Sequence, residues 1–358
     1  MSDCVTGGAK SANFDDSWPM RLEERDMQSR PVSVVIINHN GGDDLARCID
    51  SIKSQGREVE ILVVDNDSRD GSAQRAKVAH PGIRLLVDGV NDGFAGGANR
   101  GALQAKGDAL LFLNPDVILG PGCLTALLDA VWETGAPTLC APVICDQDGG
   151  RVEYGFSVDY VGDLIALKSP GLPLFLSGCA LMTTRTAFIT LGGFDAAFFM
   201  FCEDLDLCWR ALLHGFDVRV VPDAQVRHIG GASTPGGYVG RGRIEVTGFR
   251  IALRERNSIA TFFRCGPVGW LAIVLPLRIV RVGIMAMVAL LYRRPDLCKA
   301  LFGAIGWNLG RMRQLLAERR AMQIGAPGLR SRILRRRICR DLVIARALLQ
   351  YGLPKFVD

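Results

Sequence analysis

The 358-residue sequence lacks the cysteine patterns that mark metal-binding and disulfide-rich domains. It has eleven cysteines, an odd number, and no C-x-x-C pair. This argues against a zinc site and against a disulfide framework, so the sequence predicts a reducing compartment. There is also no internal period of about 20 to 50 residues, which argues against a repeat architecture.

Two kinds of apolar segment are also missing. Residues 1–30 are polar and mixed in charge, so we expect a loose tail and not a signal peptide. Within the apolar segment 268–292, the longest uncharged run is the 11 residues 282–292. A membrane-spanning helix needs about 20 apolar residues, and a central arginine costs roughly 2.5–3.5 kcal/mol on insertion scales. A simple transmembrane helix is therefore not predicted.

Positive charge is concentrated at one end of the chain. Residues 264–358 contain 18 Lys and Arg against 4 Asp and Glu, a net charge of +14, whereas residues 1–263 carry −9. We expect helices that lie in or against a membrane surface, with Arg293, Arg294 and the cluster at 330–340 facing anionic head groups. A helical appendage packed on the rest of the chain or on a second subunit, or a hairpin inserted from one leaflet, remains an alternative. Nucleic-acid binding is not expected, because the arginines alternate with aliphatic runs that offer no aromatic rings for stacking.

Apolar, β-branched segments alternate with helical segments in the first third of the chain. Strands are predicted at 32–38, 60–64, 83–87 and 109–113, with helices from Asp43 or Asp44, from Ser72 to about Ala79, and from about Ala95. Four repeats of strand and helix predict an α/β sheet with crossover helices. Further along, strands are predicted at 176–182, 217–221 and 224–228, and a short helix at 186–191.

Polar residues follow each of the four predicted strands. They are His39-Asn40, Asp65-Asn66-Asp67, Asn91-Asp92 and Asn114-Pro115-Asp116. Any one of these is an ordinary turn former. Because ligands of such sheets bind at the carboxyl ends of the strands, four in succession favour a binding site. The glycine-rich run 93–101 lacks the G-x-G-x-x-G spacing and does not follow the first strand, so it does not predict a dinucleotide fold.

The stretch FFMFCEDLDLCWR, residues 198–210, places three carboxylates in an apolar run. A helix that begins near Glu203 would put Leu205, Cys208, Trp209, Leu212 and Leu213 on one apolar stripe. Its first turn would hold Glu203 and Asp204, where the helix dipole favours negative charge. Asp206 is placed to pair with Arg210 four residues later.

Six ordered segments resemble the family-2 inverting glycosyltransferases with the GT-A fold. They are VSVVIINHNGGDDLARCIDSI, VVDNDSRDGS, NDGFAGGANRGA, LFLNPDV, GGFDAAFFMFCEDLDLCWRALLHGF and VPDAQVRHIGGAST. The resemblance covers roughly residues 31–262 and is to the bacterial rhamnosyl- and galactofuranosyltransferase-like branch. It is specific for the family and much less specific for the sugar.

The resemblance implies roles for particular residues. Asp204 matches the catalytic base, and Asp116 and His228 match metal ligands. Substrate-binding positions are Asn38, Asn40, Asp65, Asn91, Asn99, Asn114, Glu203, Trp209 and Arg256, although the apolar stripe favours a core position for Trp209. Asp65 would contact the base or ribose of the donor.

The chemistry of transfer agrees with such a set. A divalent cation, Mg²⁺ or Mn²⁺, can stabilise the departing diphosphate, and a carboxylate can deprotonate the acceptor hydroxyl. Displacement from the face opposite the leaving group inverts the anomeric carbon, without the carboxylate nucleophile of a retaining hydrolase. One departure is Asn114, which stands where the family's D-x-D motif has an acid. It removes a negative charge and makes the expected metal dependence weaker.

We therefore expect an α/β protein with a GT-A, Rossmann-like mixed sheet flanked by helices. The expected parts are a tail at 1–30, a catalytic domain at 31–262 and a basic helical region at 263–358. The expected function is transfer of rhamnose or another hexose from a dTDP- or UDP-sugar to a lipid-linked glycan acceptor in bacterial cell-surface polysaccharide synthesis. The expected location is the cytoplasmic face of the bacterial plasma membrane. A homo-oligomer is compatible with the sequence. The alternatives are a polyprenyl-phosphate glycosyltransferase and a non-catalytic nucleotide- or glycan-binding module.

Overall fold

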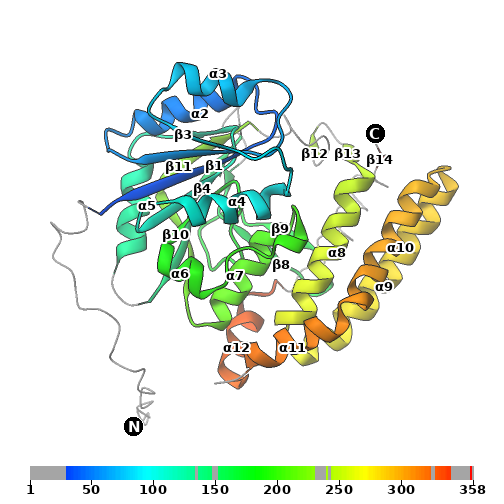
Figure 1. The fold of residues 1–358 in the computed structure, drawn as a ribbon. Helices are drawn as coiled ribbons and strands as arrows, with labels where there is room; N and C mark the ends of the chain where they lie inside the picture. The colour runs from blue at the N-terminus through cyan, green and yellow to red at the C-terminus, as the bar shows by residue number, and fades with distance from the viewer. Residues whose placement is uncertain are drawn as a thin grey trace, which may run out of the picture.

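The computed structural model describes residues 30–133, 136–146, 152–229, 239–240, 243–323, 327–339 and 355–356. The tail expected at 1–30 therefore lies outside the described residues, apart from Arg30. A nine-stranded mixed sheet of order β3-β2-β1-β4-β10-β6-β11-β5, with β7 paired to β6, forms the centre of the molecule. Helices cover both faces of the sheet, and the C-terminal helices stand at one side (Figure 1).

The first half of the sheet is parallel, as the alternation of strand and helix predicts. Its strands are β1 (Val32–Asn38), β2 (Glu60–Asp65), β3 (Arg84–Val87) and β4 (Ala109–Leu113), and its helices are α2 (Asp44–Lys53), α3 (Ser72–Ala79) and α4 (Gly93–Gln104). Asn38 and Asp65 are paired in register at the ends of β1 and β2. α2 begins at Asp44 with Asp43 at the N-cap position, as predicted, although the side chain of Asp43 makes no capping hydrogen bond.

The second half is mixed and less regular. It contains β5 (Val117–Leu119), β6 (Thr138–Cys145), β7 (Val152–Glu153), β10 (Ala180–Thr184) and β11 (Asp217–His228), with α5 (Cys123–Trp132), α6 (Arg185–Thr190), a 3-10 turn η1 (Ala196–Phe198) and α7 (Glu203–Leu213). The hairpin β8 (Phe156–Val158) and β9 (Leu164–Ala166) lies apart from this sheet. The strand predicted at 176–182 begins only at Ala180. The two strands predicted at 217–228 are one strand with a register shift between Val221 and Gln225.

Alternate residues of β1 face two cores. Val35 and Ile37 pack with α4 and α7 on one face of the sheet, whereas Val34 and Ile36 pack with α2 and α5 on the other. This explains why the strand is apolar at almost every position, because both faces of a parallel sheet are covered.

Five helices follow the sheet. They are α8 (Gly248–Cys265), α9 (Val268–Leu291), α10 (Pro295–Gly310), α11 (Met312–Gln323) and α12 (Pro327–Arg337), and short strands occur at β12 (Val239–Gly240), β13 (Arg243–Val246) and β14 (Lys355–Phe356). α9 and α10 lie side by side at the far side of α8 from the sheet (Figure 1). The domain boundary predicted at residue 262 falls inside α8.

The polarity of α9 is the reverse of that of an ordinary surface helix. Its charged residues point inward: Arg278 is 3% exposed and pairs with Asp163 at 3.1 Å, and Arg281 pairs with Glu255 at 2.9 Å. Its outward residues are apolar. Those most exposed are Val268, Ile273, Ile279, Val280, Ile284, Met287, Leu290 and Leu291. The helix is long and apolar enough to cross a membrane by length and composition, with 28% of its most apolar window buried in the protein.

Candidate active site

The carboxyl ends of β1 and β2 form a hydrogen-bonded cluster around Asp65. The amide nitrogen of Asn38 contacts Asp65 Oδ1 at 3.1 Å, Ser68 Oγ at 3.0 Å and Ser72 Oγ at 3.0 Å. Asn38 is fully buried and positions Asp65, so its predicted role in substrate binding would act through Asp65. Asp65 is itself 3% exposed and stands at the expected strand end.

Asn40 and Asn91 lie on either side of His39 at the same edge. Asn40 has a left-handed backbone, with φ of 53°, and its Oδ1 accepts a hydrogen bond from the backbone N–H of Arg69 at 2.8 Å. Its Nδ2 lies 3.2 Å from His39 Nε2, and Asn91 Nδ2 lies 3.5 Å from His39 Nδ1. The structure therefore brings together the polar residues that follow β1 and β3.

Asn66 was not among the predicted site residues, although it follows Asp65 directly. Its Nδ2 donates to the carbonyl of Gly93 at 2.7 Å, and its Oδ1 accepts from Arg100 at 2.6 Å. It thereby fixes the start of α4 against the end of β2. The signal for it was present in the sequence, because it stands with Asp65 at the same strand end.

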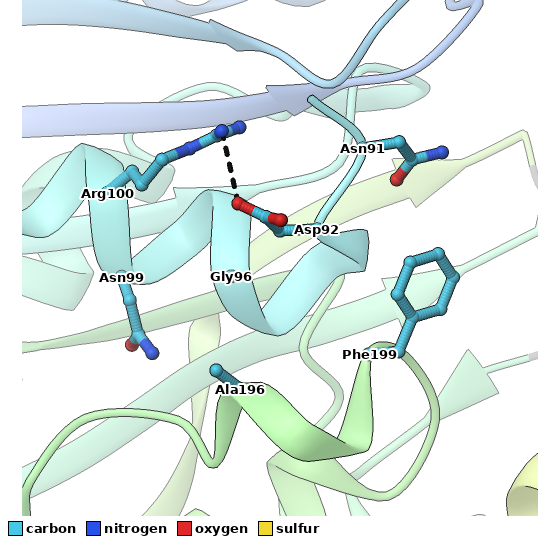
Figure 2. Close-up of a pocket in the computed structure, with 7 residues that line it drawn as sticks. All are labelled: Asn91, Asp92, Gly96, Asn99, Arg100, Ala196 and Phe199. Atoms are coloured by element: carbon cyan, nitrogen blue, oxygen red, sulfur yellow. Dashed lines mark ion pairs between the residues drawn. The ribbon is translucent and has the colours of Figure 1, made fainter. Parts of the chain in front are cut away.

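An open depression of about 460 Å³ lies between α4 and the turn η1. Figure 2 shows its seven lining residues, Asn91, Asp92, Gly96, Asn99, Arg100, Ala196 and Phe199. Asn99 lines it, but both ends of its amide are bonded to the backbone of Phe194, at 2.8 and 3.0 Å. Asn99 therefore holds the segment before η1 while it lines the depression, and its predicted substrate contact stays a prediction.

Asp116 and His228 come together from distant parts of the chain. β11 pairs with β5 so that His228 is opposite Val117, and His228 Nε2 lies 3.3 Å from Asp116 Oδ1. Within the described ranges, no group of three or more His, Cys, Asp or Glu side chains could hold a metal ion. One carboxylate and one imidazole still suit a cation that completes its shell with phosphate oxygens and water.

The loop from Ser177 to Cys179 connects this region to the acidic helix. The carbonyl of Cys179 accepts a hydrogen bond from the backbone N–H of Asn114 at 2.9 Å, and the N–H of Gly178 donates to Asp204 Oδ2 at 2.9 Å. The first bond extends the register of β10 and β4, in which Ala180 pairs with Leu113, by one pair, whereas Gly178 turns away from β4 to α7. The two bonds place Asp204 one short loop away from Asn114, and Asn114 two residues before Asp116.

Helix α7 begins at Glu203, as predicted, and presents two neighbouring acids. Asp204 also accepts a hydrogen bond at Oδ1 from the N–H of Leu205 at 2.7 Å. Burial raises the pKa of Asp204, although the N–H groups of Gly178 and Leu205 act in the opposite direction. Burial and the charge of Asp204 raise the pKa of Glu203 well above its ordinary range. The pair is therefore suited to one ionised acid, Asp204, beside one neutral acid, Glu203.

The chain enters α7 through a strained loop. Phe199, Phe201 and Cys202 all have left-handed backbones, with φ of 65°, 66° and 63°. Asn257 of α8 holds this loop, because its Nδ2 donates to the carbonyls of Phe198, Met200 and Phe201 at 3.0, 3.0 and 2.7 Å. Strain of this kind persists where surrounding contacts enforce it and is common at functional sites.

Arg256 and Trp209 both make contacts within the protein at the positions predicted to bind substrate. Arg256 donates to the carbonyls of Ala197 and Phe198 at 3.0 and 2.9 Å. Trp209 is fully buried, with its ring 5.5 Å from that of Phe262, as the apolar stripe favours.

Asp206 is the third acid of the stretch and has a separate role. It pairs with Arg210 at 2.7 Å, as predicted, and also with Arg264 of α8 at 2.8 Å. All three side chains are almost completely buried. Asp206 therefore ties α7 to α8 and does not face the site.

Comparison with known proteins agrees with this arrangement. The family model described as Glycosyl transferase family 2 matches residues 33–191. An N-acetylglucosaminyl-diphospho-decaprenol L-rhamnosyltransferase of Mycobacterium tuberculosis H37Rv is 32% identical over 229 residues, which cover 54% of this chain and 75% of that protein. The rhamnosyltransferase WbbL of Escherichia coli K12 is 25% identical over 223 residues, covering 55% of this chain and 83% of WbbL.

Solved structures support the fold. TarS residues 1–349 of S. aureus superposes with a TM-score of 0.51 at 17% identity, covering 86% of this chain and 91% of that one. GalNAc-T7 with UDP, GalNAc and Mn²⁺ gives 0.52 at 18% identity, covering 66% and 48%. The mixed sheet with helices on both faces is thus a GT-A fold. From the matched family segment and the rhamnosyltransferase relatives, we conclude that this chain is a glycosyltransferase belonging to glycosyl transferase family 2.

Proposed function

We propose that this enzyme transfers a sugar, with rhamnose the first choice, from a nucleoside diphosphate donor to a hydroxyl of a sugar linked through diphosphate to a polyprenol. The observation that carries the proposal is the position of Asp204. It is a half-buried carboxylate with a raised pKa, one loop away from Asn114 and the Asp116–His228 pair. The relatives named as rhamnosyltransferases, one of them acting on a diphospho-decaprenol-linked sugar, support the choice of donor and acceptor.

Asp204 would act as general base. A raised pKa brings a carboxylate closer to the operating pH, where it accepts a proton more effectively. The N–H groups of Gly178 and Leu205 fix the two carboxylate oxygens of Asp204. The carboxylate can therefore receive the proton of the acceptor hydroxyl in a defined geometry. Attack from the side of Asp204 on the face opposite the diphosphate gives inversion at the anomeric carbon.

Asp116 and His228 would hold Mg²⁺ or Mn²⁺ together with diphosphate oxygens. Their contact at 3.3 Å and their donor types fit such an ion. When bound, the ion offsets the negative charge of the leaving diphosphate. Asp65, supported by Asn38, would bind the ribose or base of the donor, and Asn91 would lie at the edge of the nucleotide.

Sugar transfer and inversion of the anomeric configuration are tested in one experiment. Purified protein is incubated with dTDP-rhamnose, UDP-sugars and a short-chain prenyl diphosphate-linked N-acetylglucosamine, with and without Mn²⁺. We expect a glycosylated product whose anomeric configuration by NMR is opposite to that of the donor. A retained configuration, full activity after exhaustive chelation, or transfer to prenyl phosphate alone would each contradict a stated part of the proposal.

The outer face of α9 supports a membrane location. Leu277, Ile284 and Leu291 recur at seven-residue spacing and are 42%, 54% and 76% exposed, and the arginine that borders this face, Arg281, turns to Glu255. Arg278, in the middle of α9, forms a buried ion pair with Asp163, which lies between β8 and β9. If α9 crossed the bilayer, this buried pair would have to break. We propose that α9 lies along the membrane surface with its outer face among the acyl chains.

Charge distinguishes a membrane from a second copy of the chain as the occupant of this face. Exposed basic residues flank it at both ends, Arg293 and Lys299 at one and Arg335 and Arg336 near the other. Arg335 reaches Gly269 at the start of α9, where a Cβ would lie 3.5 Å from its Nη2. These charges attract anionic head groups and would repel each other between two copies. Within the predicted basic cluster at 330–340, Arg337 is engaged in the protein, because it donates to the carbonyl of Pro173 at 2.7 Å. Arg340, the last member of the cluster, lies outside the described residues.

Flotation with vesicles tests the membrane proposal. The full chain should float with vesicles containing phosphatidylglycerol, and the triple variant Leu277→Ser, Ile284→Ser, Leu291→Ser should not. The matched control is Val78→Ser with Leu103→Ser, which removes side chains that are 81% and 75% exposed on α3 and α4. If the triple variant still floats, or if it converts a dimeric wild type into a monomer, the membrane assignment of α9 is wrong.

A further inference from the structure

Two arginines of α8 lie beside the loop that leads to Asp204. The guanidinium carbon of Arg250 is 4.8 Å from the centre of the Phe201 ring. The backbone carbonyl of Arg254 accepts a bond from Cys202 Sγ at 3.9 Å. Residues four apart lie on one face of a helix, so both side chains start from the face of α8 that meets the base.

Arg254 differs from the other buried arginines of α8 and α9. Arg264 pairs with Asp206, and Arg278 pairs with Asp163. The side chain of Arg254 makes no hydrogen bond or ion pair within the part of the chain that the structure describes. A half-buried guanidinium without a carboxylate partner is unfavourable in the free protein, which suggests that a ligand supplies the negative charge.

The two cations also act on each other and on the base. Burial, and the nearby charge of Arg254, lower the pKa of Arg250 to about 10. Burial raises the pKa of Asp204, and the charge of Arg254 partly opposes this. Like charges one helical turn apart destabilise a helix, and an anion bound beside both guanidinium groups would offset their repulsion.

The position of these arginines is suited to a lipid-linked ligand. The next residue along α8, Ile251, packs with Val282 of α9 and Leu297 of α10. Arg250 and Arg254 therefore lie on the part of α8 between Asp204 and the pair of helices α9 and α10. A ligand with a membrane-embedded chain and a sugar at the base would place its polar linkage along this stretch.

We propose that Arg250 and Arg254 form a binding site for a diphosphate group, and that this group is the linkage of the acceptor. Two guanidinium groups match the charge and the bidentate geometry of phosphate oxygens. The proposal rests on the glycosyl transfer proposed above and adds the residues that would select a diphosphate-linked acceptor. The other source of the same chemistry is the diphosphate of the nucleotide donor.

The test compares two acceptors with the same sugar, a short-chain prenyl diphosphate and an octyl glycoside, using wild type, Arg254→Gln and Arg254→Lys. Loss of a charge-assisted bond predicts that Arg254→Gln raises KM for the diphosphate acceptor roughly tenfold to hundredfold. KM for the octyl glycoside and for the donor should not change, and Arg254→Lys should recover part of the loss. The matched control is Arg47→Gln, which removes one charge from the exposed face of α2.

The KM values for the donor and for the two acceptors distinguish the possible outcomes. A rise in donor KM alone assigns the site to the donor and overturns the acceptor assignment. Equal changes for both acceptors, or no change for either, overturn the diphosphate site. If wild type uses neither acceptor, the proposed function has failed, and the site is then tested directly: inorganic diphosphate should raise the Tm of wild type and of Arg47→Gln but not that of Arg254→Gln. The same shift in all three proteins would refute it.

Discussion

The substitution Asp204→Asn separates catalysis from folding at the proposed base. Asparagine has nearly the same shape but cannot accept the proton of the acceptor. General base catalysis contributes about 10²–10⁴ in rate, or about 2.7–5.5 kcal/mol of transition-state stabilisation. We therefore expect kcat to fall by two to four orders of magnitude while the dissociation constant of the nucleotide donor, measured by calorimetry, stays the same.

The effect of this change on stability is small because two contributions oppose each other. The carboxylate of Asp204 accepts from the N–H groups of Gly178 and Leu205, and the amide can keep only one of these bonds. Losing the other costs about 1 kcal/mol. The amide also removes a carboxylate whose charged form burial disfavours, as its raised pKa shows. We expect Tm to change by no more than about 4 °C.

The pH dependence provides a second check on the same residue. The acid limb of kcat/KM should lie above pH 3.8, the ordinary pKa of an aspartate, because burial raises the pKa of Asp204. Glu203→Gln, the amide of the neighbouring acid, should leave this limb in place, since Gln resembles a neutral Glu203. If Asp204→Asn keeps more than about a tenth of the wild-type kcat, or if it loses donor binding, Asp204 is not the base.

Three further changes test the framework of the site. Glu203→Gln should raise Tm by an amount that grows above pH 4.5, because a folded-state pKa raised above that ordinary value makes wild-type stability fall as pH rises; a gain independent of pH would contradict this. Asp206→Ala leaves Arg210 and Arg264 buried without their shared partner, so urea unfolding should show a loss of about 3–5 kcal/mol, and a loss below 1 kcal/mol would be inconsistent with the network. Asn257→Ala removes three bonds to the strained loop before α7, so kcat should fall while donor affinity is kept; unchanged kcat would show that the loop does not need this support.

The sequence predicted the parallel half of the fold closely. The strands at 32–38 and 109–113 and the start of α7 at Glu203 are as expected. Local information suffices there, because each buried strand is a continuous apolar run and each helix has one apolar stripe. It also predicted that the polar residues after β1, β2 and β3 come together, since parallel strands bring their carboxyl ends to one edge.

Side-chain partners could not be predicted in the same way. Asn38, Asn99, Arg256 and Trp209 fit substrate-binding positions by motif, yet their polar groups or rings are engaged within the protein. The strand predicted at 176–182 begins only at Ala180 for a related reason, because the N–H of Gly178 donates to the side chain of Asp204 on α7 and not to a neighbouring strand. A motif records which residues occur together and not which of them face the ligand.

The sequence by itself determined the fold class, the family resemblance and the position of one acid, Asp204, at the start of a helix. Only the tertiary structure decided how three adjacent acids divide their roles, because that depends on the partners that α8 and the 177–179 loop supply. Gly178 fixes Asp204, whereas Arg264 engages Asp206. The tertiary structure also decided the orientation of α9. Its two arginines form ion pairs with Asp163 and Glu255 inside the protein, so the apolar side of the helix faces outward.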